Sequence, residues 1–186
     1  MDKRKVILVT DGDMVAKEAV ETATTNIGGR CISSSAGNPT ILTGQEIVLK
    51  IKEAAHDPVV VMVDDRGTKG EGPGEAAMAA VLDSKELDVL GVIAVSSNGK
   101  DCNGLDVSCS ITKNGEVVHT AVDKNGQDTN SDKLCGDTLS ILKSTRGLFI
   151  VGIGDPGKMD YRDEVFKGAP ITTKALQMVM DHSRVT

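Results

Sequence analysis

Aromatic side chains are almost absent from this sequence. Its 186 residues include one Tyr, two Phe and no Trp, about 2% of the chain, whereas 39% of the residues are hydrophobic. The core must therefore consist of Val, Ile, Leu, Ala and Met, which suits parallel strands that helices cover on both faces. The shortage of rings also argues against binding of single-stranded nucleic acid, which depends on aromatic stacking.

Blocks of basic residues and long apolar runs are also missing. The net charge is −6, and without a Lys/Arg-rich segment the chain lacks the means to neutralise a nucleic-acid backbone. No apolar run approaches the roughly 18–20 residues that cross a bilayer. The N-terminal segment, residues 1–5, is basic overall and leads into an apolar run that is too short for a signal peptide. We therefore expect no nucleic-acid partner, no transmembrane segment and a location on the cytosolic side.

The cysteines show no metal-binding pattern. There are four, without a C-x-x-C pair or a histidine at ligand spacing. Reduced structural thiols are the favoured interpretation, and a metal or disulfide role is the alternative. The four are Cys31, Cys102, Cys109 and Cys135.

Three short apolar runs end abruptly in turns of glycine and aspartate. Residues 6–10 precede Asp11 and Asp13, residues 59–63 precede Asp64 and Asp65, and residues 148–151 precede Asp155. A segment that can be helical follows each turn. This pattern is typical of parallel strands whose carboxyl ends open onto a shared edge, where α/β proteins usually place their sites.

The order of predicted elements indicates an α/β fold. Thr43 and Glu46 form a capping box at the start of one helix, and Asn114-Gly115 is a strong hairpin signal. We predict a single domain over residues 1–186, a three-layer α/β/α sandwich with a mostly parallel five-stranded sheet. The preferred strand order is the flavodoxin-like 2-1-3-4-5, with a β-hairpin excursion within residues 100–137. The predicted strands are 5–10, 31–32, 59–63, 89–95 and 148–153, and the predicted helices are 14–27, 43–55, 76–82, 138–143 and 170–182.

The acidic edge is the first candidate site. If strands one, three and five are neighbours, their aspartates meet at one rim, with Glu71 and Glu75 close by. Like charges raise each other's pKa unless a cation intervenes, and Mg²⁺ is the natural cation for such carboxylates. The alternative is that each aspartate only caps the helix that follows it. The candidate metal-binding residues are Asp11, Asp13, Asp64, Asp65 and Asp155.

Two further segments are candidates for binding an anion. Gly72 and Gly74 lie in a glycine-rich stretch before a helix, whose N-terminal N–H groups could hold a phosphate or carboxylate. The stretch matches neither the Walker A nor the dinucleotide-binding fingerprint, so this signal is weak. Lys158 and Lys167 lie in a long loop and could bind an anion or pair with the acidic rim; alternatively, they only face solvent.

Hydrolase chemistry is disfavoured. The three histidines His56, His119 and His182 form no catalytic dyad in the sequence, and the G-x-S-x-G motif is absent. We assign no catalytic residue and expect a protein that is not an enzyme.

The chain resembles a known family over nearly its whole length. The similarity lies in residues 6–13, 27–33, 35–40, 70–75, 90–98, 151–159 and 167–172, in this order, and weakens over residues 100–137. These segments resemble stage V sporulation protein AE, the soluble member of the SpoVA proteins of endospore-forming bacteria.

The resemblance implies a role in sporulation and spore germination. SpoVA proteins move dipicolinic acid, as its calcium chelate, across the spore inner membrane, and the soluble member is thought to lie peripherally on that membrane. The implied partners are other SpoVA proteins, with dipicolinic acid as a candidate ligand, Mg²⁺ or Ca²⁺ as candidate ions and a homo-oligomer left open. The family transfers no catalytic residues to this chain.

A second, weaker similarity concerns the Toprim domains of topoisomerases and primases, which hold Mg²⁺ on strand-end acids for phosphoryl chemistry. This chain departs from that pattern, because Asp11 replaces a glutamate and Asp64 and Asp65 are adjacent rather than spaced. The alternative function is therefore a Toprim-like domain for Mg²⁺-dependent phosphoryl transfer or for binding of a nucleotide or anion, which uses the strand-end aspartates. A degenerate or repurposed site is favoured over an active nuclease.

Overall fold

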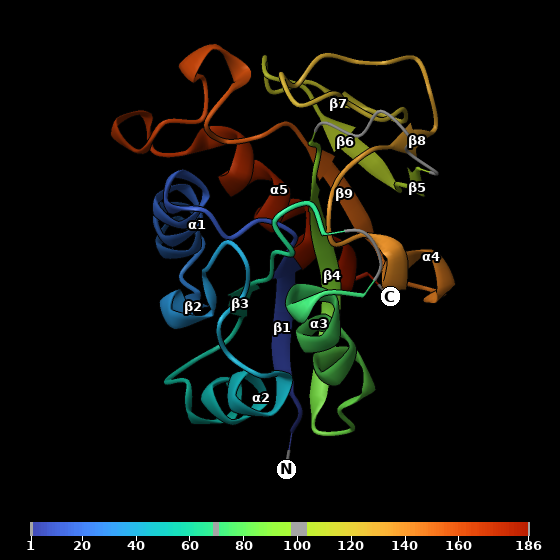
Figure 1. Ribbon diagram of the computed structural model, residues 1–186. Coiled ribbons are helices and arrows are strands. Elements are labelled where there is room, and N and C mark those ends of the chain that lie inside the picture. The colour runs from blue at the N-terminus through green and yellow to red at the C-terminus, as the bar shows by residue number, and fades with distance from the viewer. Residues whose placement is uncertain (1, 69–70, 98–103, 186) are drawn as a thin grey trace.

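A mostly parallel sheet forms the centre of the protein. The computed structural model describes residues 2–68, 71–97 and 104–185. Within these residues a seven-stranded sheet has the order β2-β3-β1-β4-β9-β6-β7, and a separate two-stranded sheet pairs β5 with β8. Figure 1 shows the sheet between helices in front and behind. The main-sheet strands are β1 (Arg4–Val9), β2 (Arg30–Cys31), β3 (Val59–Met62), β4 (Leu87–Val95), β6 (Cys109–Ile111), β7 (Val117–Val118) and β9 (Ile150–Ile153).

Helices cover both faces of this sheet, which confirms the predicted α/β sandwich. Alternate residues of β1 enter two separate cores, Val6 and Leu8 on one face and Ile7 and Val9 on the other. The first core is closed by α2, α3 and α4, and the second by α1 and α5. The helices are α1 (Met14–Asn26), α2 (Gly44–Glu53), α3 (Pro73–Asp83), α4 (Ser140–Ser144) and α5 (Pro170–Ser183).

Short elements complete the chain. The 3₁₀ turns are η1 (Ser33–Ser35), η2 (Met159–Tyr161) and η3 (Val165–Lys167), and the small second sheet consists of β5 (Leu105–Asp106) and β8 (Lys133–Leu134). The predicted capping box is present, because the Thr43 side chain accepts from Glu46 N–H while the Glu46 carboxylate accepts from Thr43 N–H. None of the described helices is both long and apolar enough to span a membrane.

The predicted strand order 2-1-3-4-5 is wrong. β3 lies between β2 and β1, and β4 lies between β1 and β9, so strands one and five are not neighbours. Both orders satisfy short, right-handed crossovers, and the sequence pattern does not choose between them. All the strands still run parallel through β9, so their carboxyl ends share one edge.

The hairpin around Asn114-Gly115 is present but is not an excursion from the sheet. β6 and β7 pair antiparallel as predicted, while β6 also pairs in parallel with β9 and extends the main sheet beyond five strands. Ser108 and Ser110 bring two side-chain hydroxyls to this added edge, and the Ser108 hydroxyl accepts from Ile150 N–H at 3.0 Å. The part of the predicted insertion at residues 100–103 lies outside the described residues.

The expectation of reduced cysteines holds for two of the four. Cys31 and Cys109 are free thiols, and burial raises the pKa of both, that of Cys31 to about 11. Cys135 is disulfide-bonded, so the expectation is wrong there. Cys102 lies outside the described residues.

Candidate functional site

A small pocket opens at the carboxyl ends of the parallel strands. Its volume is about 130 Å³, and five of the residues that line it are aspartates. β1 contributes Asp11 and Asp13 through the turn that follows it, β3 contributes Asp64, and β9 contributes Asp155. The remaining lining residues are Thr10, Asn38, Val95, Ser96, Ser97 and Asp137.

The turn after β1 holds its two aspartates in a fixed arrangement. Asp11 Oδ1 accepts from the N–H groups of Gly12 at 2.7 Å and Asp13 at 3.2 Å. Asp13 Oδ1 accepts from Ala16 N–H at 2.9 Å and caps α1. Gly12 is needed here because a Cβ atom would lie 2.5 Å from the carbonyl oxygen of Gly37. Asp13 therefore caps α1 and lines the pocket together with Asp11.

Burial and mutual repulsion raise the pKa values of this cluster. The pKa of Asp11 rises from 3.8 to about 7, first because of burial and then because of the charge of Asp13, with smaller effects from Asp155 and Asp64. Burial is also the main cause of the raised pKa of Asp64 and of Asp155. Negative charge is therefore costly in this pocket, and a bound cation would stabilise it.

The structure brings four of the five predicted aspartates to this pocket. Asp137 also lines it, and sequence reasoning missed that residue. No apolar run precedes Asp137, so the strand-end pattern that marked the other aspartates gave no signal there. The hydroxyl oxygen of Ser97, also at the pocket, is buried and has no hydrogen-bond partner among the described residues.

A preformed metal-ligand set is not seen in the part of the chain that the structure describes. No three His, Cys, Asp or Glu side chains there are arranged to hold a metal ion. The carboxylates surround a cavity instead. Metal binding by Asp11, Asp13, Asp64 and Asp155 therefore stays a prediction.

Asp65, the fifth predicted metal-binding residue, has another environment. Its side chain is 1% exposed, and its Oδ1 atom accepts from Gly74 N–H at 2.6 Å. Its Oδ2 atom accepts from Glu75 N–H at 3.1 Å. Asp65 thus caps α3 from a loop that precedes the helix by several residues.

The contact between Asp65 and the start of α3 explains why glycine occupies positions 72 and 74. A Cβ atom on Gly72 would lie 2.2 Å from Asp65 Oδ1, and one on Gly74 would lie 2.7 Å from backbone atoms of Asp64. Both glycines therefore permit the close approach of α3 to the end of β3. At the start of α3, the N–H groups of Gly74 and Glu75 already donate to Asp65 rather than to an external anion.

The two predicted glutamates lie on α3 and the loop before it. The Glu75 carboxylate is buried and accepts from Ser140 N–H at 2.6 Å, which links α3 to α4. Glu71 is exposed, and together with Glu75, Ser140 and Ile141 it lines a separate cavity of about 330 Å³. Neither glutamate lines the aspartate pocket.

The two predicted lysines separate in the structure. Lys158 lies close enough to Asp155 for its charge to oppose the rise in the pKa of that carboxyl. Lys167 instead donates from its ammonium to the carbonyl of Tyr161 and lies beside the ring of Phe166. Of the two predicted lysines, Lys158 is therefore the one whose charge acts on an aspartate of the pocket.

Comparison with known proteins gives one result that covers nearly the whole chain. The family model described as stage V sporulation protein AE1 matches residues 5–183. No curated protein and no solved structure matches the chain significantly. The matched span includes every strand of the main sheet except the first residue of β1, and it includes all the aspartates of the pocket. The chain therefore belongs to the stage V sporulation protein AE1 family.

Proposed function

We propose that this protein is a non-enzymatic accessory of the SpoVA system that supports the movement of dipicolinic acid in sporulation and spore germination. The observation that carries this proposal is the family match over residues 5–183, since membership implies a role in sporulation. In this proposal the protein associates peripherally with SpoVA partners at the spore inner membrane.

The chemistry of the described side chains supports a role without catalysis. The free thiols Cys31 and Cys109 have raised pKa values, so neither is an activated nucleophile. The ring of His182 stacks on Phe149 with the ring centroids 4.0 Å apart, and His56 Nε2 lies 3.2 Å from the Gly29 carbonyl oxygen. Neither histidine lines the aspartate pocket.

A deletion strain of the spore-forming host tests the proposal. Spores without the gene should contain less dipicolinic acid or release it more slowly, and the intact gene should restore both. A matched strain that carries Asp64→Asn asks whether the pocket takes part. Deletion spores with normal dipicolinate content and normal release would contradict the proposal.

A cation-binding domain is the second candidate function, and a specific observation favours it. Four predicted aspartates and Asp137 surround one pocket at the strand ends, the place where Toprim-like domains hold Mg²⁺. The ligand would then be a divalent cation, alone or with a bound phosphate or carboxylate.

Thermal unfolding in the presence of Mg²⁺, Mn²⁺ or Ca²⁺ tests this second candidate. A cation present at a hundred times its dissociation constant adds about 2.7 kcal/mol to the free energy of unfolding. Asp64→Asn should abolish the resulting rise in melting temperature, whereas Asp88→Asn, on the exposed surface of β4, should leave it unchanged. An equal rise in all three proteins, or none with any ion, rules against the candidate.

A further inference from the structure

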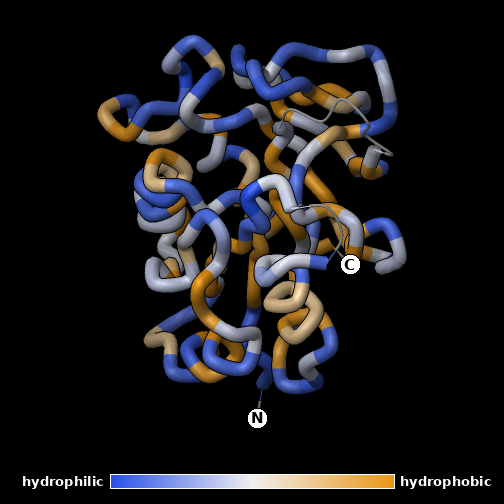
Figure 2. The backbone as a smooth tube through the Cα atoms, viewed as in Figure 1, coloured by the Kyte–Doolittle hydropathy of each residue, from blue (hydrophilic) through white to orange (hydrophobic). Residues whose placement is uncertain are grey.

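Two of the three Phe and Tyr residues of the chain are exposed on one loop. We call residues 158–167 the aromatic loop; it follows β9 and contains η2 and η3. Tyr161 is 67% exposed and Phe166 is 79% exposed, and Val165 beside it is 43% exposed. Figure 1 shows this part of the chain projecting beyond α1, and Figure 2 shows hydrophobic colour at the tip of the projecting turn. In a chain so poor in aromatic residues, this placement needs an explanation.

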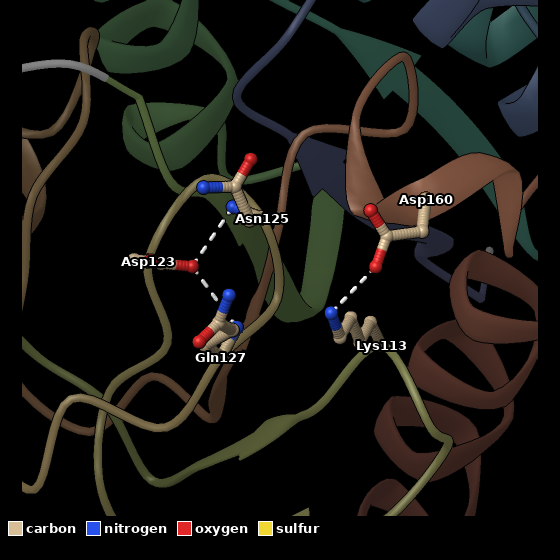
Figure 3. Close-up of polar contacts among 5 residues, drawn as sticks. All are labelled: Lys113, Asp123, Asn125, Gln127 and Asp160. Carbon is tan, nitrogen blue, oxygen red and sulfur yellow. Dashed lines mark hydrogen bonds and ion pairs between the residues drawn. The ribbon is translucent and has the colours of Figure 1, made fainter.

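The first turn of the loop holds Tyr161 in an unfavourable backbone conformation. Met159, Asp160 and Tyr161 have φ angles of 41°, 49° and 57°. These angles lie in the left-handed region, which residues other than glycine rarely adopt. The Met159 side chain is buried and anchors the turn. Lys113 Nζ donates to Asp160 Oδ2 at a distance of 2.5 Å, and Figure 3 shows this contact. Tertiary contacts thus fix a turn that presents Tyr161 to solvent.

The second turn is tied to the first by one ammonium group. Lys167 Nζ donates to the carbonyl of Tyr161 and lies 5.3 Å from the centroid of the Phe166 ring. The end of the loop is held by Asn26 of α1, whose side-chain amide donates to the Gly168 carbonyl at 2.9 Å. Both aromatic side chains therefore project from a loop that is fixed at its base.

The aromatic loop also carries three exposed cations, against the overall charge of the chain. Lys158, Arg162 and Lys167 are exposed, although the chain has a net charge of −6. Of the acids in the loop, Asp160 is paired with Lys113 and Asp163 is buried, which leaves Glu164. Aromatic rings beside Lys and Arg are the combination that suits the boundary between lipid headgroups and acyl chains.

We propose that the aromatic loop inserts into the surface of an anionic lipid bilayer. Phe166, Val165 and Tyr161 enter the headgroup region, while Lys158, Arg162 and Lys167 contact lipid phosphates. The loop projects beyond α1 (Figure 1), which favours a lipid surface as its partner. This inference rests on the proposed function, because both place the protein at a membrane. The proposed function invokes contact with SpoVA proteins, whereas this inference invokes contact with the lipid.

The sequence supplies an internal probe for this proposal. Tyr161 is the only Tyr and there is no Trp, so intrinsic fluorescence excited at the tyrosine band reports on this one position. Phosphatidylcholine vesicles that contain phosphatidylglycerol should protect Tyr161 from acrylamide quenching, and vesicles of phosphatidylcholine alone should not. The protection should decrease with added salt, because the lipid charge is screened.

Matched variants separate insertion from nonspecific adsorption in vesicle co-sedimentation. Phe166→Ser should lower the partition coefficient about tenfold or more, and Lys158→Gln about fivefold. Ile41→Ser removes an equally exposed apolar side chain, 81% exposed and on a different loop, and should change nothing. Lys85→Gln is the corresponding control for charge.

Three results would overturn the proposal: no binding to anionic vesicles, unchanged binding by Phe166→Ser, or unchanged quenching of Tyr161 in the bound state. A concentration-dependent dimer that Phe166→Ser dissociates would assign the loop to a second copy of the chain instead. Failure to bind vesicles while deletion spores still lose dipicolinate would overturn this inference and leave the proposed function standing. Deletion spores with normal dipicolinate content and release, together with vesicle binding by the protein, would overturn the proposed function and leave this inference standing.

Discussion

Asp65 Oδ1 accepts a hydrogen bond of 2.6 Å from the backbone N–H of Gly74, nine residues further along the chain. The same spacing recurs between Asp163 and Thr172 at the start of α5, where Asp163 Oδ2 accepts from the Thr172 hydroxyl at 2.6 Å. Asp163 Oδ1 also accepts from Ile171 N–H at 2.7 Å. In both places a buried carboxylate from a preceding loop occupies the helix N-terminus, which would otherwise be a site for an external anion.

Removing the Asp65 carboxylate should destabilise the protein. Asp65→Ala leaves the buried N–H groups of Gly74 and Glu75 without acceptors, at a cost of about 2–3 kcal/mol in the free energy of unfolding. Urea denaturation measures the loss. Asp88→Ala, at an exposed position of β4, should stay within about 0.5 kcal/mol of the wild type. A cost as small as that of Asp88→Ala would show that the capping contact contributes little.

Gly74 should not tolerate a side chain. Gly74→Ala places a Cβ atom 2.7 Å from three backbone atoms of Asp64, so α3 must shift away from β3, at a cost of about 1–3 kcal/mol. Gly157→Ala is the control, because its closest contact is a side-chain oxygen, Asp155 Oδ1, at 3.2 Å. Melting temperatures of the two variants make the comparison; equal values would contradict the close packing at Gly74.

The contribution of Asp11 to the stability of the protein should fall as the pH rises from about 4 to 7. The ordinary pKa of an aspartate is 3.8, and the pKa of Asp11 in the folded protein is about 7, so the folded state holds a proton that the unfolded state releases in this range. The contribution is complete below pH 3.8 and is lost as the pH passes 7. Three pKa units correspond to about 4 kcal/mol, an upper bound because Asp11 is only half-buried and solvent screens its charge.

Asp11→Asn identifies the source of that pH dependence. The amide cannot ionise, so the variant should lose most of the slope and should exceed the wild type in stability above pH 7. The variant should still show a smaller decrease of stability with pH, because the pKa values of Asp64 and Asp155 are also raised. Urea denaturation at intervals of pH gives both curves, and parallel curves would exclude Asp11 as the main titrating group.

Direct binding of dipicolinate should depend on Lys158 rather than on Lys167. Lys158 lies near Asp155 at the pocket, whereas the ammonium of Lys167 contacts the Tyr161 carbonyl and the Phe166 ring. Titration calorimetry with calcium dipicolinate should show heat that Lys158→Ala removes and Lys167→Ala retains. Equal heats from the two variants would place the ligand away from Lys158.

Local sequence signals determined the elements of this fold. The β-branched runs gave the buried strands, the Thr43–Glu46 capping box gave the start of α2, and Asn114-Gly115 gave the β6–β7 hairpin. These signals act between residues close in sequence, where propensity and hydrogen bonding are decided by neighbours. The shortage of aromatic residues likewise fixed a core of aliphatic side chains covered on both faces.

Only the tertiary structure decided which strands are neighbours and what each aspartate does. Asp64 and Asp65 are adjacent and follow the same apolar run, yet Asp64 lines the pocket while Asp65 caps α3. Asp137 joins the pocket although no apolar run precedes it in the sequence, and β4 separates β1 from β9. Such relationships depend on packing between residues far apart in the sequence. The hydrophobic pattern of one strand shows that the strand is buried but does not show which strand pairs with it.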